Sequence, residues 1–248
     1  MRRSSPNGRE SVALPLAQQD GFFRDRSTGT DECVADNGIC PQWAIDNFDR
    51  YVDPFFEHLV LVVVSVAIGF AISFALAVVA HRRRWLVGPI TQATGILYTI
   101  PSLAAFFLLL PITGRGRTTA IVALTAYTLF IFFRNFTAGL DGVPEEARDA
   151  GRGMGFTDRQ LLWRVELPLA LPAILAGLRI ALTTTVGLAA LAFYAGGGGL
   201  GEALASQKQF QTNVLLAGGL CVVMAVVLDA AVLGAQRVLT PWSRARAT

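Results

Sequence analysis

The chain has 248 residues, of which 53% are hydrophobic and 16% are charged, and its mean hydropathy is +0.49. Soluble domains carry about 25% charged residues, so this composition excludes an ordinary soluble protein and favours an integral membrane protein. Lys and Arg number 21 against 18 Asp and Glu. The resulting net charge of +3 is too small to indicate nucleic-acid binding.

Residues 1–57 form a polar segment with ten acidic residues and six arginines. A flexible, irregular tail is one interpretation of this segment. Cys33 and Cys40 lie within it, and two cysteines in a segment that faces an oxidising compartment favour a disulfide that closes a small loop. Both interpretations remain open at this point.

Five apolar segments are predicted to be transmembrane helices, because each approaches the roughly 20 residues that hydrocarbon requires. They cover about residues 59–80, 86–111, 118–133, 171–193 and 213–236. Pro89 and Pro101 interrupt the second span, and helix breakers at membrane depth survive where a neighbouring helix or a water-lined cavity satisfies the freed carbonyls. Thr99, Pro101 and Ser102 are therefore candidate pathway residues, with a plain kink as the alternative.

Five spans place successive loops on alternate sides of the membrane. On one side, the turn after the first span, the loop 134–170 and the C-terminal end carry eleven arginines, whereas the other side has three basic residues outside the N-terminal segment. The positive-inside rule then predicts that the loop 134–170 and the tail 238–248 are cytoplasmic and that the N-terminal segment is outside. The chain is thus expected to be a multi-pass protein of the plasma (inner) membrane, in contact with lipid.

The most polar part of the chain after the first span is residues 142–172, which predict two short helices joined by a glycine elbow. Pro144 suits the first position of a helix, where its missing N–H costs nothing. Three glycines weaken the end of this helix and permit a left-handed turn, namely Gly151, Gly153 and Gly155.

The start of the second short helix is indicated by Thr157 with Gln160 three residues later, a capping-box pattern. Phe156 and Leu161 flank it at the spacing of a hydrophobic staple. Pro168 is predicted to end this helix, because the residue before a proline is pushed away from helical geometry.

Two ionisable residues, Arg179 and Asp229, lie inside predicted spans, each at a depth of ~12 Å from the cytoplasmic face. Opposite charges in hydrocarbon usually pair or face water, so these two are predicted to face the bundle interior and to contact each other. The alternative is that Arg179 reaches back to the cytoplasmic loop and Asp229 meets a water-filled cavity.

No catalytic or metal-binding constellation is predicted. The two histidines, His58 and His81, lie at span ends, and no GxxxxGK[ST] motif is present for ATP. The glycine-rich stretch at residues 196–201 lacks the preceding strand that a phosphate cradle needs, so turn flexibility or close helix approach explains it better. Neither a catalytic residue nor a cofactor is therefore expected in this chain.

The loop resembles the cytoplasmic motif of permease subunits of ATP-binding-cassette (ABC) importers, which runs Glu-Ala-Ala, three residues, Gly, nine residues, Ile, one residue, Leu-Pro. Every interval fits, with Asp in place of Glu, Gly in place of the second Ala and Val165 in place of Ile. The residues assigned to ATPase coupling by this resemblance are Glu145, Glu146, Ala147, Asp149, Ala150, Gly151, Gly155, Leu167 and Pro168.

Further stretches resemble the branch of this family that imports glycine betaine, carnitine and choline. They are 99–104, Arg134-Asn135 with Gly139, 166–172, 176–179 and 198–201. The resemblance implies an all-α type I importer permease with five transmembrane helices at residues 58–237 and a cytoplasmic coupling loop.

The resemblance also implies partners. A cytoplasmic ABC ATPase would hold ATP and Mg²⁺, a second permease chain would complete the pathway, and a separate external binding protein would deliver the solute. Another small solute such as methionine is the alternative cargo, since the loop motif reports coupling. A membrane-embedded transferase is the rival from another class, and a membrane scaffold is the third possibility.

Overall fold

The computed structural model describes Cys33 and residues 38–241. This part of the chain is helical and contains no strand. Its helices, in chain order, are α2 (Pro41–Asp46), η1 (Phe48–Tyr51), α3 (Val52–Arg82), η2 (Arg84–Leu86), α4 (Val87–Thr99), α5 (Ser102–Thr113), α6 (Arg117–Asp141), α7 (Glu145–Gly153), α8 (Asp158–Leu161), η3 (Leu162–Glu166), α9 (Leu167–Ala189), η4 (Ala192–Ala195), α10 (Leu200–Ser206) and α11 (Gln211–Leu239).

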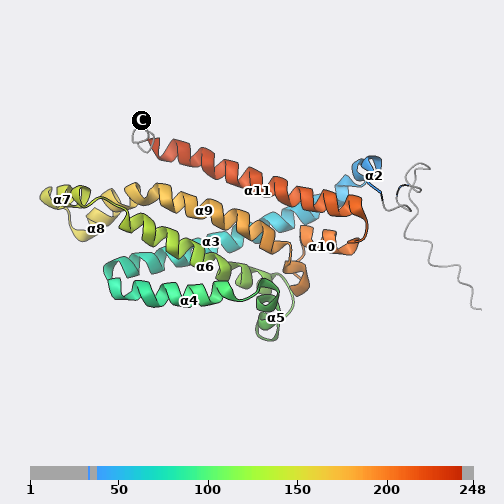
Figure 1. The fold of residues 1–248 in the computed structure, drawn as a ribbon, viewed down its shortest axis with the longest axis horizontal. Helices are drawn as coiled ribbons and strands as arrows, with labels where there is room; N and C mark the ends of the chain where they lie inside the picture. Colours follow the sequence, from blue (N-terminus) through green and yellow to red (C-terminus); the bar gives the residue numbers. More distant parts are fainter. Residues whose placement is uncertain (1–32, 34–37, 242–248) are drawn as a thin grey trace, which may run out of the picture.

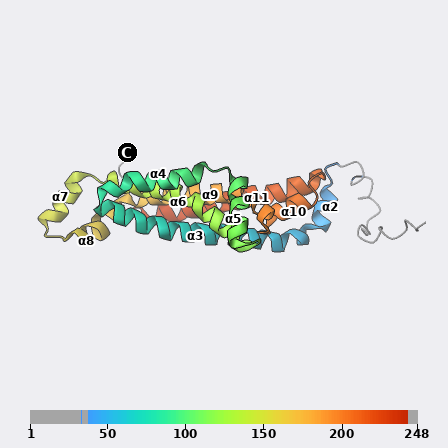
Figure 2. The same cartoon turned by 90° about the horizontal axis from the view of Figure 1, so that it is seen from below.

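The helices form an elongated bundle in which α7 and α8 project at one end, and α2 and α10 lie at the other (Figures 1 and 2). We call these the α7 end and the α10 end. Four helical segments of the described chain are long and apolar enough to cross a membrane: 48–82, 117–141, 158–189 and 211–239. The bent pair α4–α5 makes a fifth span when it is counted as one.

Helix α6 is the centre of the bundle, and α11 lies at its periphery. In their most apolar windows, 61% of α6 residues are buried against 11% of α11 residues. Helix α6 packs between α3 and α9, and α4 covers a further side of it. Glycines allow the closest approaches, because a Cβ on Gly69 of α3 would lie 1.9 Å from the Thr128 hydroxyl of α6.

The second predicted span is two helices rather than one. Helices α4 and α5 meet at an angle of 97°, and the break falls at Ile100 and Pro101, which have extended backbone. Pro89 does not interrupt anything, because it lies in the first turn of α4, where a missing N–H is tolerated.

The prediction that Pro168 ends the second loop helix is wrong. The chain stays helical from Asp158 to Ala189, and Pro168 lies near the start of α9. The turn just before it, Leu162–Glu166, is π-helical. Because a π turn shifts the register of the backbone hydrogen bonds, it accommodates a proline that would otherwise clash with a carbonyl one turn earlier.

Three other boundaries differ from the predictions. The third span does not end at Phe133, because α6 continues to Asp141. The glycine-rich connection contains the short helix α10. The N-terminal segment is not irregular throughout, since it contains α2 and η1, and α3 begins before the predicted span. The remainder of that segment, except residues 33 and 38–40, and the tail from residue 242 lie outside the described residues.

The predicted alternation of the loops agrees with the contacts at both ends. At the α10 end, Arg117 at the start of α6 forms an ion pair with Glu57 near the start of α3. At the α7 end, His81 near the end of α3 contacts Glu166, and Arg84 pairs with Asp141 at the end of α6. The described C-terminal residues also lie at the α7 end (Figure 1).

Candidate functional site

Helix α7 is amphipathic in an unusual sense, because its buried face holds a charged residue, Arg148, beside a glycine. Arg148 and Gly151 are buried against the rest of the loop, whereas Glu146, Asp149 and Ala150 are exposed. Pro144 occupies the position before the first helical residue, one position earlier than predicted. The resulting helix offers a short, solvent-facing surface at the tip of the bundle.

Two of the three predicted elbow glycines have a geometric reason in this structure. A Cβ on Gly151 would lie 2.6 Å from Leu161 Cδ1, so this position keeps α7 and α8 in close contact. Gly155 has a φ of +80°, the left-handed conformation that favours glycine. Gly153 has open space around it and no positive φ, so neither reason applies there.

The start of α8 follows the sequence prediction. Thr157 accepts a hydrogen bond from the Gln160 backbone N–H, and the Gln160 side chain accepts from the Thr157 backbone N–H at 2.9 Å, which completes a capping box. Phe156 and Leu161 both lie against Gly151, as expected of the staple. Trp163 on the following turn lies 6.1 Å, centroid to centroid, from Phe74 of α3. The loop is therefore a packed unit.

A network of buried charges joins α7 to the bundle. The Arg148 guanidinium donates to Glu166 Oε1 at 2.8 Å, to Glu145 Oε2 at 3.0 Å and to the Leu140 carbonyl at 2.7 Å. His81 Nε2 lies 2.9 Å from Glu166 Oε2. Arg148 is 9% exposed and Glu166 is 4% exposed, so little water competes for these contacts.

The protonation of this network follows its contacts. Hydrogen bonds from Arg148 and then Arg152 lower the pKa of Glu145 below its ordinary value. Burial acts to lower the pKa of Arg148, but the hydrogen bonds to Glu166 and Glu145 outweigh it and raise that pKa. Both groups are therefore charged at neutral pH.

The remaining residues of the predicted coupling set lie in different places. Ala147 is half-buried on α7. Leu167 packs against the core, and Pro168 follows it in the first turn of α9. These last two residues connect the loop to the membrane helices and are not part of its exposed surface.

Arg179 of α9 and Asp229 of α11 are in contact, as predicted, but their side chains are 33% and 31% exposed, so the pair lies at the edge of the bundle and not in its interior. The guanidinium donates from Nε to Oδ1 and from the terminal nitrogen to Oδ2, both at 2.7 Å. This two-point geometry satisfies both oxygens of the carboxylate. The alternative, in which Arg179 reaches the loop and Asp229 meets water without it, does not describe this structure.

The break at Ile100 and Pro101 is supported from α6. The Tyr127 hydroxyl donates to the Ile100 carbonyl that the break leaves without a helical partner, as the sequence argument requires of a breaker at membrane depth. Thr99 and Pro101 are exposed and Ser102 is half-buried. The break therefore lies on a face of α4–α5 that this chain leaves uncovered.

A cavity of about 370 Å³ opens on the same side of α6. Tyr98, Phe130, Arg134, Asn135 and Ile180 are among the residues that line it. Arg134 lies over the Phe130 ring at 5.6 Å, and no carboxylate of the described residues pairs with it. The cavity therefore combines aromatic side chains with a cation that has no carboxylate partner among the described residues.

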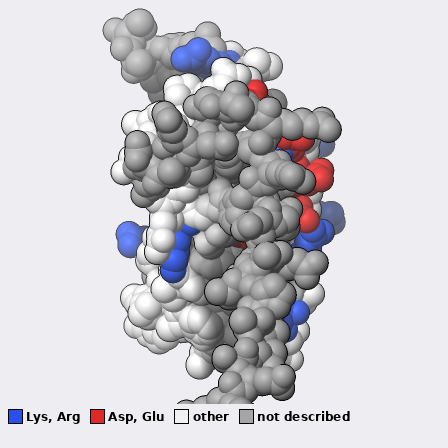
Figure 3. Space-filling model, turned by 90° about the vertical axis from the view of Figure 1, so that its right-hand side faces the viewer, with Lys and Arg blue, Asp and Glu red and all other residues white. Residues whose placement is uncertain are grey.

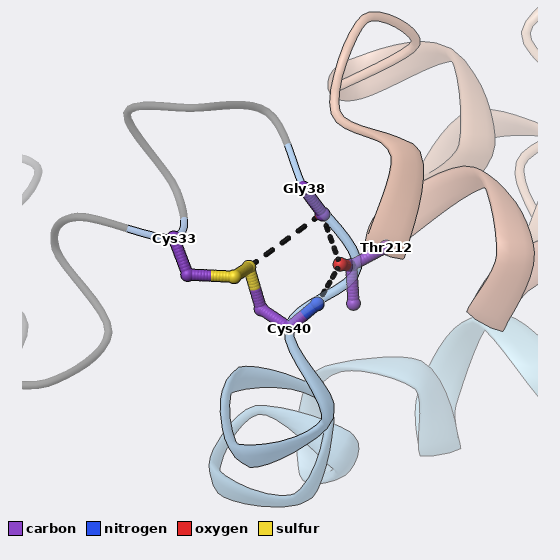
Figure 4. Close-up of a disulfide and its surroundings, with 4 residues drawn as sticks. All are labelled: Cys33, Gly38, Cys40 and Thr212. Carbon is purple, nitrogen blue, oxygen red and sulfur yellow. Dashed lines mark hydrogen bonds between the residues drawn. A yellow bond between two sulfur atoms is a disulfide. The ribbon is translucent and has the colours of Figure 1, made fainter.

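A segment that contains a disulfide lies over the α10 end of the bundle. We call its described part, Cys33 and residues 38–46, the disulfide cap. Cys33 and Cys40 are bonded. The Thr212 hydroxyl at the start of α11 donates to the Gly38 carbonyl at 3.0 Å and accepts from the Cys40 N–H at 2.8 Å (Figure 4). Trp43 packs edge-on against Phe210 with ring centroids 4.8 Å apart. The cap thus fastens the chain before α3 onto α11.

Figure 3 looks onto the α10 end, where acidic side chains gather along one side. The exposed acidic residues that precede α3's apolar stretch or lie on α10 are Asp46, Asp49, Asp53 and Glu202. Within the part of the chain that the structure describes, no group of three His, Cys, Asp or Glu side chains has a metal-binding arrangement.

A protein-family model described as the inner membrane component of binding-protein-dependent transport systems matches residues 56–245. The chain belongs to this family. The family match begins within α3, so the disulfide cap lies outside it. The loop with α7, the bent pair and the two intramembrane charges all lie inside it.

Curated relatives of the family are similar over most of the chain. The osmoprotectant import permease protein OsmW of Salmonella typhimurium is 37% identical and covers 80% of this chain and 96% of its own length. The choline transport system permease protein OpuBB of Bacillus subtilis is 35% identical and covers 75% of this chain and 87% of its own. The glycine betaine/carnitine/choline permease OpuCB of the same organism is 33% identical, with 75% and 86% covered.

Solved structures share the fold. The methionine ABC transporter MetNI, in inward-facing conformations, aligns with a TM-score of 0.68 at 25% identity over 79% of this chain and 98% of the matched chain. An amino-acid ABC transporter with histidines aligns with a TM-score of 0.62 at 18% identity. The predicted class, an all-α type I ABC importer permease, is confirmed.

Sequence reasoning missed the Arg148–Glu166–His81 network. The sequence analysis uses Arg148 only as one of the loop arginines that indicate topology. It uses Glu166 only within the stretch 166–172 that resembles the family, and His81 only as a residue at the end of a span. The available signal was Glu166 at the start of the last, apolar stretch that leads into the fourth predicted span, two residues before Pro168, because a carboxylate beside such a stretch needs a cationic partner.

Proposed function

We propose that this chain is the transmembrane subunit of an ATP-driven importer for a small osmoprotectant such as glycine betaine, carnitine or choline. The similarity to OsmW, 37% over nearly all of that protein, carries this proposal. Methionine is less favoured as cargo, because identity to the MetNI chain is 25%. The chain itself hydrolyses nothing in this scheme, and ATP with Mg²⁺ belongs to a partner ATPase.

The exposed face of α7 is the proposed contact with the ATPase. Glu146, Asp149 and Ala150 point away from the bundle, whereas Gly151 and Gly155 hold the helix against α8 in one geometry. A rigid, protruding helix transmits displacement, which a flexible loop would absorb. The α7 end is then cytoplasmic, and the α10 end with its disulfide faces the oxidising side.

The uncovered face of α4, α5 and α6 is the proposed pathway. It carries the break at Thr99, Pro101 and Ser102 and the cavity beside Arg134. A second permease chain is expected to close this face, because five spans enclose little on their own. An external binding protein would deliver the solute at the α10 end.

Reconstitution tests the proposal. The chain is combined in proteoliposomes with a candidate ATPase and a candidate binding protein of the same transport system. ATP-dependent accumulation of radiolabelled glycine betaine, carnitine or choline, in excess over methionine, is the expected result. Accumulation of methionine alone, or of none of the four solutes when the complex is assembled and hydrolyses ATP, would contradict it.

A further inference from the structure

Within the described residues, helix α7 is hydrogen-bonded to other helices through one side chain. Its other charged contacts, Glu145 with Arg152 and Asp149 with Arg152, stay within the helix. Among the described residues, Arg148 alone sends side-chain hydrogen bonds from α7 to other elements, to the Leu140 carbonyl of α6 and to Glu166 of the π turn. Any displacement of α7 therefore acts on these two groups.

Glu166 is the branch point of this connection. One carboxylate oxygen accepts from Arg148 Nε at 2.8 Å, and the other lies 2.9 Å from His81 Nε2 of α3. Both oxygens are used and the residue is 4% exposed, so the carboxylate has little freedom to reorient. Moving Arg148 without moving His81 would break a buried charge-assisted contact.

The π turn at Leu162–Glu166 places this carboxylate. Such single turns inside longer helices are often associated with function, because they redirect the side chains that follow. Here the turn directs Glu166 toward α3, a long helix that is not covalently joined to the loop.

Helix α3 extends the connection to the α10 end. It is unbroken from Val52 to Arg82, so His81 and Glu57 are separated by about 36 Å along one rigid element. Glu57 accepts from the Gly199 N–H at 3.2 Å and pairs with Arg117. A Cβ on Gly199 would lie 3.2 Å from His58, so the glycine-rich turn sits directly on α3.

We propose that Glu166 is the positioning residue that couples α7 to α3 through Arg148 and His81. In this arrangement α3 carries displacement of α7 to the glycine-rich turn at the opposite end of the bundle. The proposal rests on the proposed ATPase contact of α7. It adds a side-chain route to α3, which branches at Glu166 from the backbone connection between α8 and α9.

The test compares two substitutions of His81 in the reconstituted complex. His81→Gln keeps a nitrogen donor at the position of Nε2, whereas His81→Leu removes it. We expect His81→Leu to lower uptake per ATP hydrolysed at least fivefold while the ATPase still co-purifies, and His81→Gln to stay within twofold of the parent. His81 is partly exposed at 16%, so neither change should prevent folding.

Glu166→Asp is the second variant, because it keeps the charge and withdraws the carboxylate by one methylene from both partners. It should also uncouple uptake from hydrolysis with the ATPase bound. Parental coupling ratios in both His81→Leu and Glu166→Asp would overturn the proposal. Failure of the ATPase to associate with the parent chain would instead refute the proposed function, so the two failures are distinguishable.

Discussion

Arg179 of α9 and Asp229 of α11 face each other through two hydrogen bonds of 2.7 Å, within segments long and apolar enough to span a membrane. Helix α11 is otherwise little buried and packs mainly against α9. The pair therefore attaches the middle of the last span to α9, and breaking it leaves one charge without its partner inside a predicted span.

Asp229→Asn and Arg179→Gln should each lower the melting temperature of the purified protein and the amount of assembled complex. The exchange Arg179→Asp with Asp229→Arg should recover most of both losses, because the opposite charges again face each other. Thermal unfolding of the four variants in detergent measures this. Losses in the exchanged variant equal to the two single losses added together would show that the pair is not coupled.

The three glycines at positions 151, 153 and 155 allow a matched series of Gly→Ala substitutions. Gly151→Ala should destabilise the loop by about 1–3 kcal/mol through overpacking against Leu161. Gly155→Ala should cost about 1–2 kcal/mol through its positive φ. Gly153→Ala is the control and should be neutral or stabilising by up to ~1 kcal/mol, since it lies at the helical end of α7 with open space around it.

ATPase binding by the same three variants is measured by co-purification. Gly151→Ala and Gly155→Ala should weaken it, and Gly153→Ala should not. An equal effect of all three substitutions would mean that the loop geometry is not what the ATPase recognises.

Acid should weaken the attachment of α7 in a defined direction. The folded-state pKa of Glu145 is lowered from 4.5 by hydrogen bonds from Arg148 and Arg152. Its stabilising contribution is therefore complete above pH 4.5 and is lost as the pH falls through the lowered value.

Melting temperatures of the parent chain and of Glu145→Gln between pH 7 and pH 3 check this. The difference between them should shrink on acidification. Glu146→Gln is the control, because Glu146 has no hydrogen-bond partner among the described residues. A difference for Glu145→Gln that is constant across this range would contradict the assignment.

The disulfide predicts the thiol count. When the protein is denatured without reductant, it should show one free thiol, that of Cys221. After reduction it should show three. A disulfide that closes so short a loop raises the free energy of unfolding by about 2–3 kcal/mol, because it reduces the entropy of the unfolded chain. The double change Cys33→Ser with Cys40→Ser should therefore lower the free energy of unfolding by about that amount. Thr212→Val tests whether the cap acts through α11. A melting temperature unaffected by both would show that the cap is not attached to the bundle.

The sequence was sufficient for features set by local chemistry. The capping box at Thr157 and the left-handed glycine at position 155 follow from residue type and spacing. The five apolar segments followed from length and hydropathy alone.

Features that depend on packing between distant segments could not be predicted from the sequence. The sequence predicts a helix end at Pro168, because the residue before a proline is disfavoured in helical geometry. The π turn at Leu162–Glu166 instead shifts the backbone hydrogen bonds by one residue, so the chain stays helical through the proline. Pro101 is recognised as a helix breaker, but neither the angle of 97° nor the hydrogen bond from Tyr127 of α6 to the Ile100 carbonyl can be read from the local sequence. His81 and Glu166 are 85 residues apart, so nothing local reports their contact.

The central claim is that the exposed face of α7 binds the ATPase, and site-directed crosslinking tests it most directly. In a Cys221→Ser background, Asp149→Cys and Glu146→Cys should crosslink to the ATPase within the assembled complex, with yields that change when ATP is added. Val226→Cys on the exposed face of α11 should give none. An ATPase that co-purifies but crosslinks to neither α7 position, in the presence or absence of ATP, would contradict the account.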